Sequence, residues 1–157
     1  MKIALIGASG RVGQAILAEA LERGHTVTAI ARNAAKLTAA PHLKTVDADV
    51  ADVAQTAAAV KGSDAVISAF NSGWTNPNIR ADFAKGMEGI IAGVKQAGVK
   101  RILFLGGAGS LTEKAARLVD HPSFNPAYKE GALSAADALD RVRKERDLEW
   151  TFISPPR

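Results

Sequence analysis

The sequence contains no cysteine, which excludes disulfide bonds and thiolate chemistry. Aromatic residues are scarce as well, at 5% of the chain, and there is a single tyrosine. No stretch approaches the roughly 20 apolar residues that a membrane-spanning helix needs. Residues 3–6 are apolar and follow Met1 and Lys2 directly, without the basic region and long apolar core of a signal peptide. We therefore expect a cytoplasmic protein that does not enter a membrane.

Signals for a metal site or a nucleic-acid partner are also missing. The histidines, His25, His42 and His121, are scattered along the chain and form no metal-ligand pattern. The net charge is +4, but the basic residues are interspersed with acidic ones. The one dense basic stretch, residues 141–146, falls at the end of an expected helix, where cations complement the helix dipole. We expect no metal and no nucleic acid as partners.

The composition and the hydrophobic pattern favour an α/β fold. With 47% hydrophobic and 23% charged residues, the chain is typical of one globular domain spanning residues 1–157. Short aliphatic runs alternate with longer stretches of helical periodicity, as in successive β-α units. The runs are almost continuously hydrophobic, which suits a parallel sheet covered on both faces. The expected strands are residues 2–6, 26–31, 43–46, 65–68, 101–105 and 150–153.

Helical periodicity fills the gaps between these strands. Residues 78–97 place Ile79, Phe83, Ile90, Val94 and Ala97 on one stripe, and residues 128–146 place Ala132, Ala135, Leu139 and Val142 on another. Both stripes are expected to face the sheet. Glycines at 24, 62 and 98 follow helical runs, where a left-handed residue ends a helix. Residues 106–127 form a long connection with several glycines and prolines, which either lines a site or is mobile.

The strongest functional signal is the loop GASGRVG at residues 7–13, between the first expected strand and a helix. Gly7 permits the tight turn, Gly10 lets a pyrophosphate approach the backbone, and Gly13 permits close helix-strand packing. Free amides at the start of the helix then face the anion. This context predicts a dinucleotide site. The loop residues expected to contact the cofactor are Gly7, Ser9, Gly10, Arg11, Val12 and Gly13.

The end of the second strand indicates which nicotinamide nucleotide is bound. Enzymes that use NAD usually carry Asp or Glu there for the ribose hydroxyls, whereas this chain has Arg32. A guanidinium suits the 2′-phosphate of NADP, and Arg11 could approach the same phosphate from the glycine loop. We therefore predict that NADP(H) is preferred over NAD(H).

Two further strand ends are expected at the cofactor. Asp49 and Val50 follow the third strand, where the carboxylate could meet the adenine amino group; Asp49 could equally cap the next helix, with Asp52 as the rival cap. Residues 68–71 end the fourth strand at the point where the strand order reverses, so Ala69, Phe70 and Asn71 are expected to line the nicotinamide ribose.

Four stretches of the chain resemble the atypical short-chain dehydrogenases, and more closely the NmrA-like and flavin-reductase-like NAD(P)H-binding proteins. They are KIALIGASGRVG at 2–13, GSDAVI at 62–67, GVKRI at 98–102 and WTFISPP at 150–156. The resemblance implies a Rossmann fold with strand order 3-2-1-4-5-6 and a cofactor held by the glycine loop and Arg32. It also implies Asp49 and Val50 beside the adenine and Pro155 near the nicotinamide. Family members usually continue for some tens of residues further, so a C-terminal part is expected after Arg157.

The catalytic residues depart from the resemblance. Carbonyl-reducing short-chain dehydrogenases use Tyr-x-x-x-Lys on one helix, in which the lysine lowers the tyrosine pKa. Here the tyrosine is Tyr128 and the residue four positions later is Ala132, while Lys129 points elsewhere on the helix. We expect Tyr128 not to be an essential proton donor. Ser110 follows the fifth strand and is a second candidate, either bonding a substrate carbonyl or serving as an ordinary loop serine.

Two functions remain open at this stage. The first is an NADPH-dependent reductase whose small-molecule acceptor is a flavin, a quinone or a similar conjugated compound that takes its proton from water. The second is a non-catalytic NADP(H) sensor, because a fold alone does not fix a function. Both are compatible with an oligomer.

Overall fold

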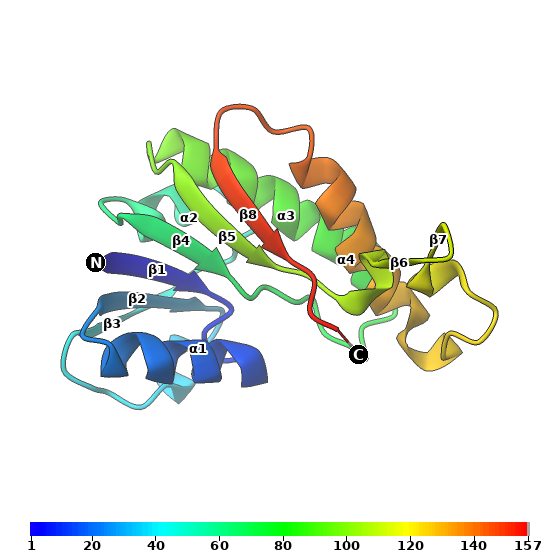
Figure 1. The fold of residues 1–157 in the computed structure, drawn as a ribbon. Coiled ribbons are helices and arrows are strands. Elements are labelled where there is room, and N and C mark those ends of the chain that lie inside the picture. Colours follow the sequence, from blue (N-terminus) through cyan, green and yellow to red (C-terminus); the bar gives the residue numbers. More distant parts are fainter. Residues whose placement is uncertain (157) are drawn as a thin grey trace.

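A parallel six-stranded sheet forms the centre of the molecule in the computed structural model, which describes residues 1–156 (Figure 1). Its strands follow the aliphatic runs, and their order is β3-β2-β1-β4-β5-β8. The predicted α/β fold and strand order are confirmed. The sixth parallel strand is labelled β8 because β6 and β7 form a separate short hairpin before it in the chain. The strands are β1 (Lys2–Ile6), β2 (Thr26–Ala31), β3 (Leu43–Asp47), β4 (Ala65–Ser68), β5 (Arg101–Leu105) and β8 (Glu149–Ile153).

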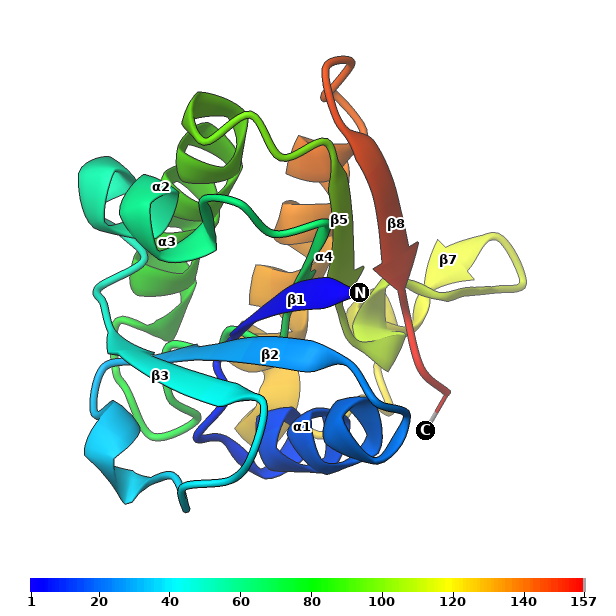
Figure 2. The same cartoon turned by 90° about the vertical axis from the view of Figure 1, so that its left-hand side faces the viewer.

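Helices pack on both faces of this sheet, but unequally. They are α1 (Arg11–Glu22), α2 (Val53–Val60), α3 (Ile79–Gln96) and α4 (Lys129–Val142). Helix α1 packs Leu17 and Ala20 against Leu5 on one face, and Figure 2 shows it on the opposite side of β1–β3 from α2 and α3. The larger core lies on the other face, where Ile90 of α3 and Val142 of α4 are fully buried. Helix α1 is the one α-helix of residues 1–156 on its face, since β2 and β3 are joined only by a 3-10 turn at Ala34–Lys36. It lies over β1 to β3, whereas Leu103, Leu105 and Ile153 on the same face of β5 and β8 stay partly exposed.

Glycines end the helices as predicted. Gly24, Gly62 and Gly98 have φ angles of 82°, 80° and 76°, in the left-handed region that a residue with a Cβ rarely adopts. Each follows directly after the C-cap residue of α1, α2 or α3. These positions therefore turn the chain back toward the next strand.

The apolar stripe of α3 is confirmed, and that of α4 is partly wrong. In α3, Ile79, Phe83, Ile90 and Val94 are buried, and Ala97 beyond its end packs on the core. Helix α4 ends at Val142 rather than at residue 146, and it buries Ala132, Ala136, Ala138 and Val142, whereas Ala135 and Leu139 are half-buried. The reason is that α4 packs against α3 and the loop after β5 as well as the sheet, so its buried surface is broader than one stripe.

The long connection after β5 contains short elements of secondary structure that pack against α4. It contains the hairpin of β6 (Thr112–Glu113) and β7 (Ala116–Arg117), which projects beside α4 in Figure 1. Val119 is fully buried, and Gly109 packs so closely that an added Cβ would lie 2.9 Å from the Cβ of Ala132. The connection is thereby fixed to the start of α4. Among the helices of residues 1–156, none has both the length and the apolar character to cross a membrane.

Candidate functional site

Two adjoining cavities open at the carboxyl ends of the parallel strands. The first has a volume of about 410 Å³ and the second about 790 Å³. The loops after β1, β2 and β4 border both, so that Gly10, Arg32, Ala69, Phe70 and Asn71 lie at the junction. The cavities therefore form one elongated cleft at the edge where α/β sheets bind their ligands.

The glycine loop borders this cleft with two glycines that the fold itself requires. Gly7 has a φ of 77°, and a Cβ there would lie 2.5 Å from the carbonyl oxygen of Ala69. A Cβ on Gly13 would overlap the backbone of Gly7 and Ala8. Gly7 thus makes the turn and Gly13 brings α1 against β1, which are the roles that the sequence predicted for them.

Gly10 is different, because nothing in the protein explains the missing side chain. It is the N-cap residue of α1 with a φ of −72°, which any residue can adopt, and a Cβ would meet only the Gly7 carbonyl oxygen, at 3.4 Å. No side chain of residues 1–156 caps the helix at this end. The first turn of α1 therefore has no side-chain cap and borders the second cavity, and such a helix start fits a phosphate group.

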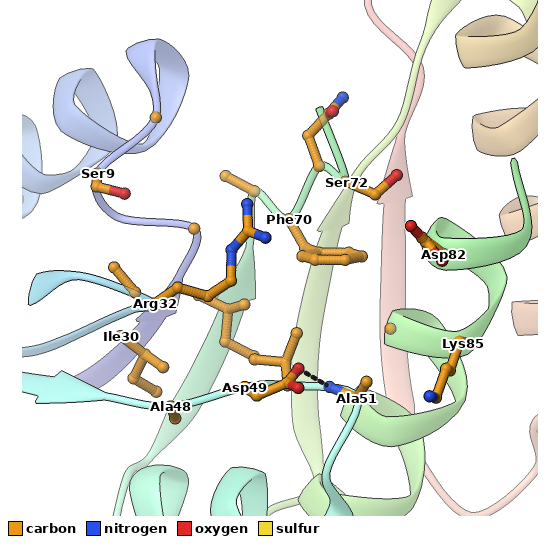
Figure 3. A pocket seen from close by; sticks show the side chains of 18 of the residues that line it. Ser9, Ile30, Arg32, Ala48, Asp49, Ala51, Phe70, Ser72, Asp82 and Lys85 are labelled. Atoms are coloured by element: carbon orange, nitrogen blue, oxygen red, sulfur yellow. Dashed lines mark hydrogen bonds between the residues drawn. The ribbon is translucent and has the colours of Figure 1, made fainter. Parts of the chain in front are cut away.

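The first cavity receives Arg32 from the end of β2. In Figure 3 its guanidinium extends into the middle of the cavity toward Phe70. Arg32 is exposed, and no ion pair within residues 1–156 includes it. Arg32 lines both cavities and Arg11 the second only, so the two arginines share the second cavity. That they approach one phosphate remains a prediction.

The chain after β3 forms another wall of the first cavity. Asp52 caps α2 by accepting a hydrogen bond of 2.9 Å from the Gln55 amide, so the alternative of Asp49 as the cap is excluded. Asp49 accepts a hydrogen bond of 3.0 Å from the Ala51 amide and borders the cavity beside buried Val50. Its carboxylate remains accessible to a ligand.

The opposite wall comes from α3, which the sequence did not connect with the site. Asp82 and Lys85 line the first cavity across from Arg32 in Figure 3. Neither belongs to the apolar stripe of α3, and the polar face of an amphipathic helix is normally only solvated. Gly86 leaves room for the Phe70 ring. The centroid of that ring lies 5.3 Å from the centroid of the Phe83 ring, and the two planes are tilted by 34°. The spacing of three between Asp82 and Lys85 is common in amphipathic helices and gave no signal of a site.

The second cavity has a largely apolar and aromatic lining. Trp74 and Tyr128 form a T-shaped pair with ring centroids 6.0 Å apart and planes at 85°. Phe124 and Pro155 also line this cavity. Among the described lining residues, the charged ones are Arg11 and Arg32 alone.

All the residues predicted to bind the cofactor line one or both cavities. Gly7, Ser9, Asp49 and Val50 lie in the first, and Arg11, Val12, Gly13 and Pro155 in the second. Their contacts with a bound nucleotide remain predictions. Sequence reasoning missed Trp74 and Phe124 in the second cavity, for which the scarcity of aromatics was the one available signal.

The two candidate catalytic residues have different surroundings. The hydroxyl of Ser110 donates to the carbonyl oxygen of Gly107 at 3.1 Å and lies 2.8 Å from the hydroxyl of Ser154. It lines neither cavity, so the structure favours its interpretation as a loop serine. Tyr128 does line the second cavity, but Ala132, at the lysine position of Tyr-x-x-x-Lys, is buried close to Gly109.

Comparisons with known proteins show the family of this chain. A family model described as NAD(P)H-binding matches residues 7–157. The uncharacterized protein YwnB of Bacillus subtilis is 37% identical over 158 residues, which cover 99% of this chain and 71% of YwnB. A crystal structure from Bacteroides thetaiotaomicron, described as a candidate epimerase, is 43% identical with a TM-score of 0.88, covering 98% of this chain and 70% of the other. A candidate NADH-flavin reductase from Streptococcus pneumoniae is 38% identical with a TM-score of 0.81, covering 99% and 71%.

Proposed function

Since this chain belongs to the NAD(P)H-binding family, we propose that it is an NADPH-dependent oxidoreductase that reduces a flavin, a quinone or a similar conjugated small molecule. Membership of this family and the Rossmann fold support the binding of a nicotinamide nucleotide. One relative at 38% identity is named for flavin reduction with NADH, which supports this class of acceptor.

The main support for the proposal is the start of α1, which has no side-chain cap. Its N-cap residue is Gly10, where the fold itself does not require a glycine. Gly10 leaves the approach to the helix amides open, and the cleft continues from there in both directions. A dinucleotide has its pyrophosphate in the middle and a ring system at each end. The adenosine half would take the first cavity and the nicotinamide half the second.

Arg32 supports NADPH as the preferred cofactor. Its guanidinium extends into the first cavity without an acidic partner among residues 1–156. A phosphate on the adenosine ribose would form a charge-assisted hydrogen bond with it, whereas the hydroxyl of NAD offers no anion. The preference follows from charge and does not need Arg11.

The bound nicotinamide would supply the hydride, and the chain's residues orient the reactants and exclude water. Phe70, Trp74 and Pro155 give the second cavity an apolar lining suited to a conjugated ring. A hydride and one proton together reduce a quinone or a flavin, and the proton can come from water. This chemistry therefore requires no tyrosine acid, in agreement with Ala132 at the position of the lysine.

The proposal is tested by following the loss of NADPH absorbance as the cofactor is oxidised. NADPH oxidation is followed with menadione and with riboflavin as separate acceptors, and the affinities of NADPH and NADH are measured by titration. We expect saturable oxidation with at least one acceptor and tighter binding of NADPH. Tight binding without turnover on either acceptor would contradict the reductase and favour the nucleotide sensor.

A further inference from the structure

We infer that Trp74 and Tyr128 form the acceptor-binding element of the second cavity, an aromatic corner on which a flat, uncharged, conjugated ring of the isoalloxazine or quinone type stacks. This inference rests on the proposed function, because it assumes that the nicotinamide half occupies the other part of the same cavity. Trp74 belongs neither to the glycine loop nor to the Tyr-x-x-x-Lys pattern, and Tyr128 takes part here through its ring rather than as a proton donor.

The aromatic corner joins two elements that are distant in the sequence. Trp74 lies in the connection between β4 and α3, whereas Tyr128 ends the 3-10 turn that precedes α4. Their ring planes are nearly perpendicular, at 85°, with centroids 6.0 Å apart. A flat ligand in such a corner can stack on one ring while its edge meets the other, and both arrangements are favourable for aromatic systems.

Gly131 allows Trp74 to pack closely on α4. A Cβ at that position would overlap the six-membered ring of Trp74, so the indole lies directly on the first turn of α4. Gly131 is inside a helix, where glycine is about 1 kcal/mol less favourable than alanine. The close approach of Trp74 therefore gives a reason for a residue that the helix itself disfavours.

Both aromatic side chains of the corner are exposed to solvent. Trp74 is 60% exposed and Tyr128 57% exposed, although large aromatic side chains usually bury most of their surface. In a chain with few aromatic residues, these two are exposed together at the mouth of an apolar cavity. Exposed apolar groups gathered at a concave site are typical of ligand binding. Phe124 extends the same lining.

The lining also fits the proposed ligand by its charge. The charged side chains among the described lining residues, Arg11 and Arg32, belong to the glycine loop and the end of β2. The other residues that line this cavity are uncharged, including Ser123, Asn125 and Gly73. A neutral ring with carbonyl oxygens can accept hydrogen bonds there and needs no counter-ion.

The test uses the full chain saturated with NADP⁺, with riboflavin and menadione as the two probes. Riboflavin binding is measured by calorimetry and by the quenching of its own fluorescence, which stacking on indole or phenol causes. We expect Trp74→Ala to weaken riboflavin binding about tenfold and to reduce the quenching at saturation, as loss of one stacking partner would. Menadione binding, measured by calorimetry, is expected to weaken in parallel if the quinone uses the same corner.

Two further variants separate stacking from a general structural effect. Gly131→Ala favours the helix but displaces the indole, so it should weaken riboflavin binding several-fold without lowering the melting temperature. Trp150→Phe is the matched control, because Trp150 lies on β8 and lines neither cavity. It should leave riboflavin binding within twofold, and all three variants should keep the NADP⁺ affinity.

The outcomes distinguish this inference from the proposed function. Unchanged riboflavin and menadione binding in Trp74→Ala, or no binding of either probe to the NADP⁺-loaded chain, overturns the aromatic corner and leaves cofactor binding intact. Failure of NADP⁺ to bind the unmodified chain overturns the proposed function instead. In that case riboflavin binding to the free chain that depends on Trp74 still supports the corner.

Discussion

A Cβ atom on Gly10 would lie 3.4 Å from the carbonyl oxygen of Gly7, an ordinary van der Waals distance. The fold therefore tolerates a side chain at this position, and what the side chain would obstruct is the approach to the amides of α1. We predict that Gly10→Val lowers NADP⁺ affinity at least a hundredfold, because its branches occupy the path of the pyrophosphate. The cost in stability should stay near 1 kcal/mol, the difference between glycine and a poor N-cap residue. Calorimetric titration and thermal unfolding measure the two effects.

Gly13→Ala is the matched control for Gly10→Val. Its Cβ would overlap the backbone of Gly7, so this variant should lose about 1–3 kcal/mol of stability through overpacking. Normal nucleotide binding by Gly10→Val would show that Gly10 is only a turn residue.

The charge of Arg32 supports the second prediction. We expect Arg32→Asp to weaken NADPH binding about 10- to 100-fold, since a charge-assisted hydrogen bond contributes about 1.5–3 kcal/mol. The introduced carboxylate should bond the ribose hydroxyls of NADH and reverse the order of affinities. Both affinities are measured by fluorescence titration at fixed ionic strength.

Arg146→Asp makes the same change in net charge at an exposed position beyond α4. It should leave the ratio of the two affinities unchanged. A preference of the unmodified chain for NADH, or equal affinities, would refute the assignment of Arg32 to the 2′-phosphate.

The third prediction concerns the hydroxyl of Tyr128. A phenol with a pKa near 10 donates a proton readily at neutral pH only when an ammonium group stands close. Ala132 occupies the position where that ammonium would originate, and it is buried close to Gly109. Tyr128→Phe keeps the ring and should retain most of any flavin- or quinone-dependent NADPH oxidation. The kcat and the KM for each substrate are measured by steady-state kinetics.

Tyr128→Ala removes the ring as well and should raise the KM for the acceptor while sparing that for NADPH. If Tyr128→Phe instead lost a hundredfold or more in kcat with its NADPH affinity unchanged, the hydroxyl would be the proton donor and the protein an ordinary carbonyl reductase.

The fourth prediction concerns an ion-pair cluster between α3 and the turn after α4. The side chain of Glu145 is only 8% exposed and accepts hydrogen bonds from Arg141 at 2.8 Å and Lys95 at 3.0 Å. Burial alone would raise the pKa of the Glu145 carboxyl, but the bonds from Arg141 and Lys95 outweigh burial and hold that pKa below its ordinary value. The ionised carboxylate therefore stabilises the folded chain above the unfolded-state pKa, near 4.3. This stabilisation is lost as the pH falls through the lower folded-state pKa.

Glu145→Gln should accordingly lower the free energy of unfolding by about 1–2 kcal/mol at pH 7, with the difference shrinking toward pH 3. Urea unfolding at the two pH values measures it. Asp147→Asn is the control, because Asp147 pairs with the same Lys95 at 3.3 Å but is 71% exposed. Its effect should stay below about 0.5 kcal/mol. An equal loss at both pH values would assign the effect of Glu145 to packing rather than charge.

Local patterns in the sequence determined much of the fold. The aliphatic runs predicted all six strands of the sheet to within one residue, and the glycines at 24, 62 and 98 gave the helix ends. The loop at residues 7–13 gave the position of the cleft, because a glycine's conformation and the start of a helix depend on neighbours within a few residues. Parallel strands then bring their carboxyl ends to one edge, so the residues after β2, β3 and β4 had to meet there.

Only the tertiary structure decided which side chains complete the site. Trp74 meets Tyr128 and Gly131 across more than 50 residues of chain, and Lys85 reaches the first cavity from a face that looked merely solvated. The same holds for Ser110, which bonds Ser154 at the end of the neighbouring strand β8 rather than entering the cleft. Such contacts depend on how α3, α4 and the loop after β5 pack against one another. That packing is the sum of many small interactions between distant residues, which periodicity and turn preferences do not encode.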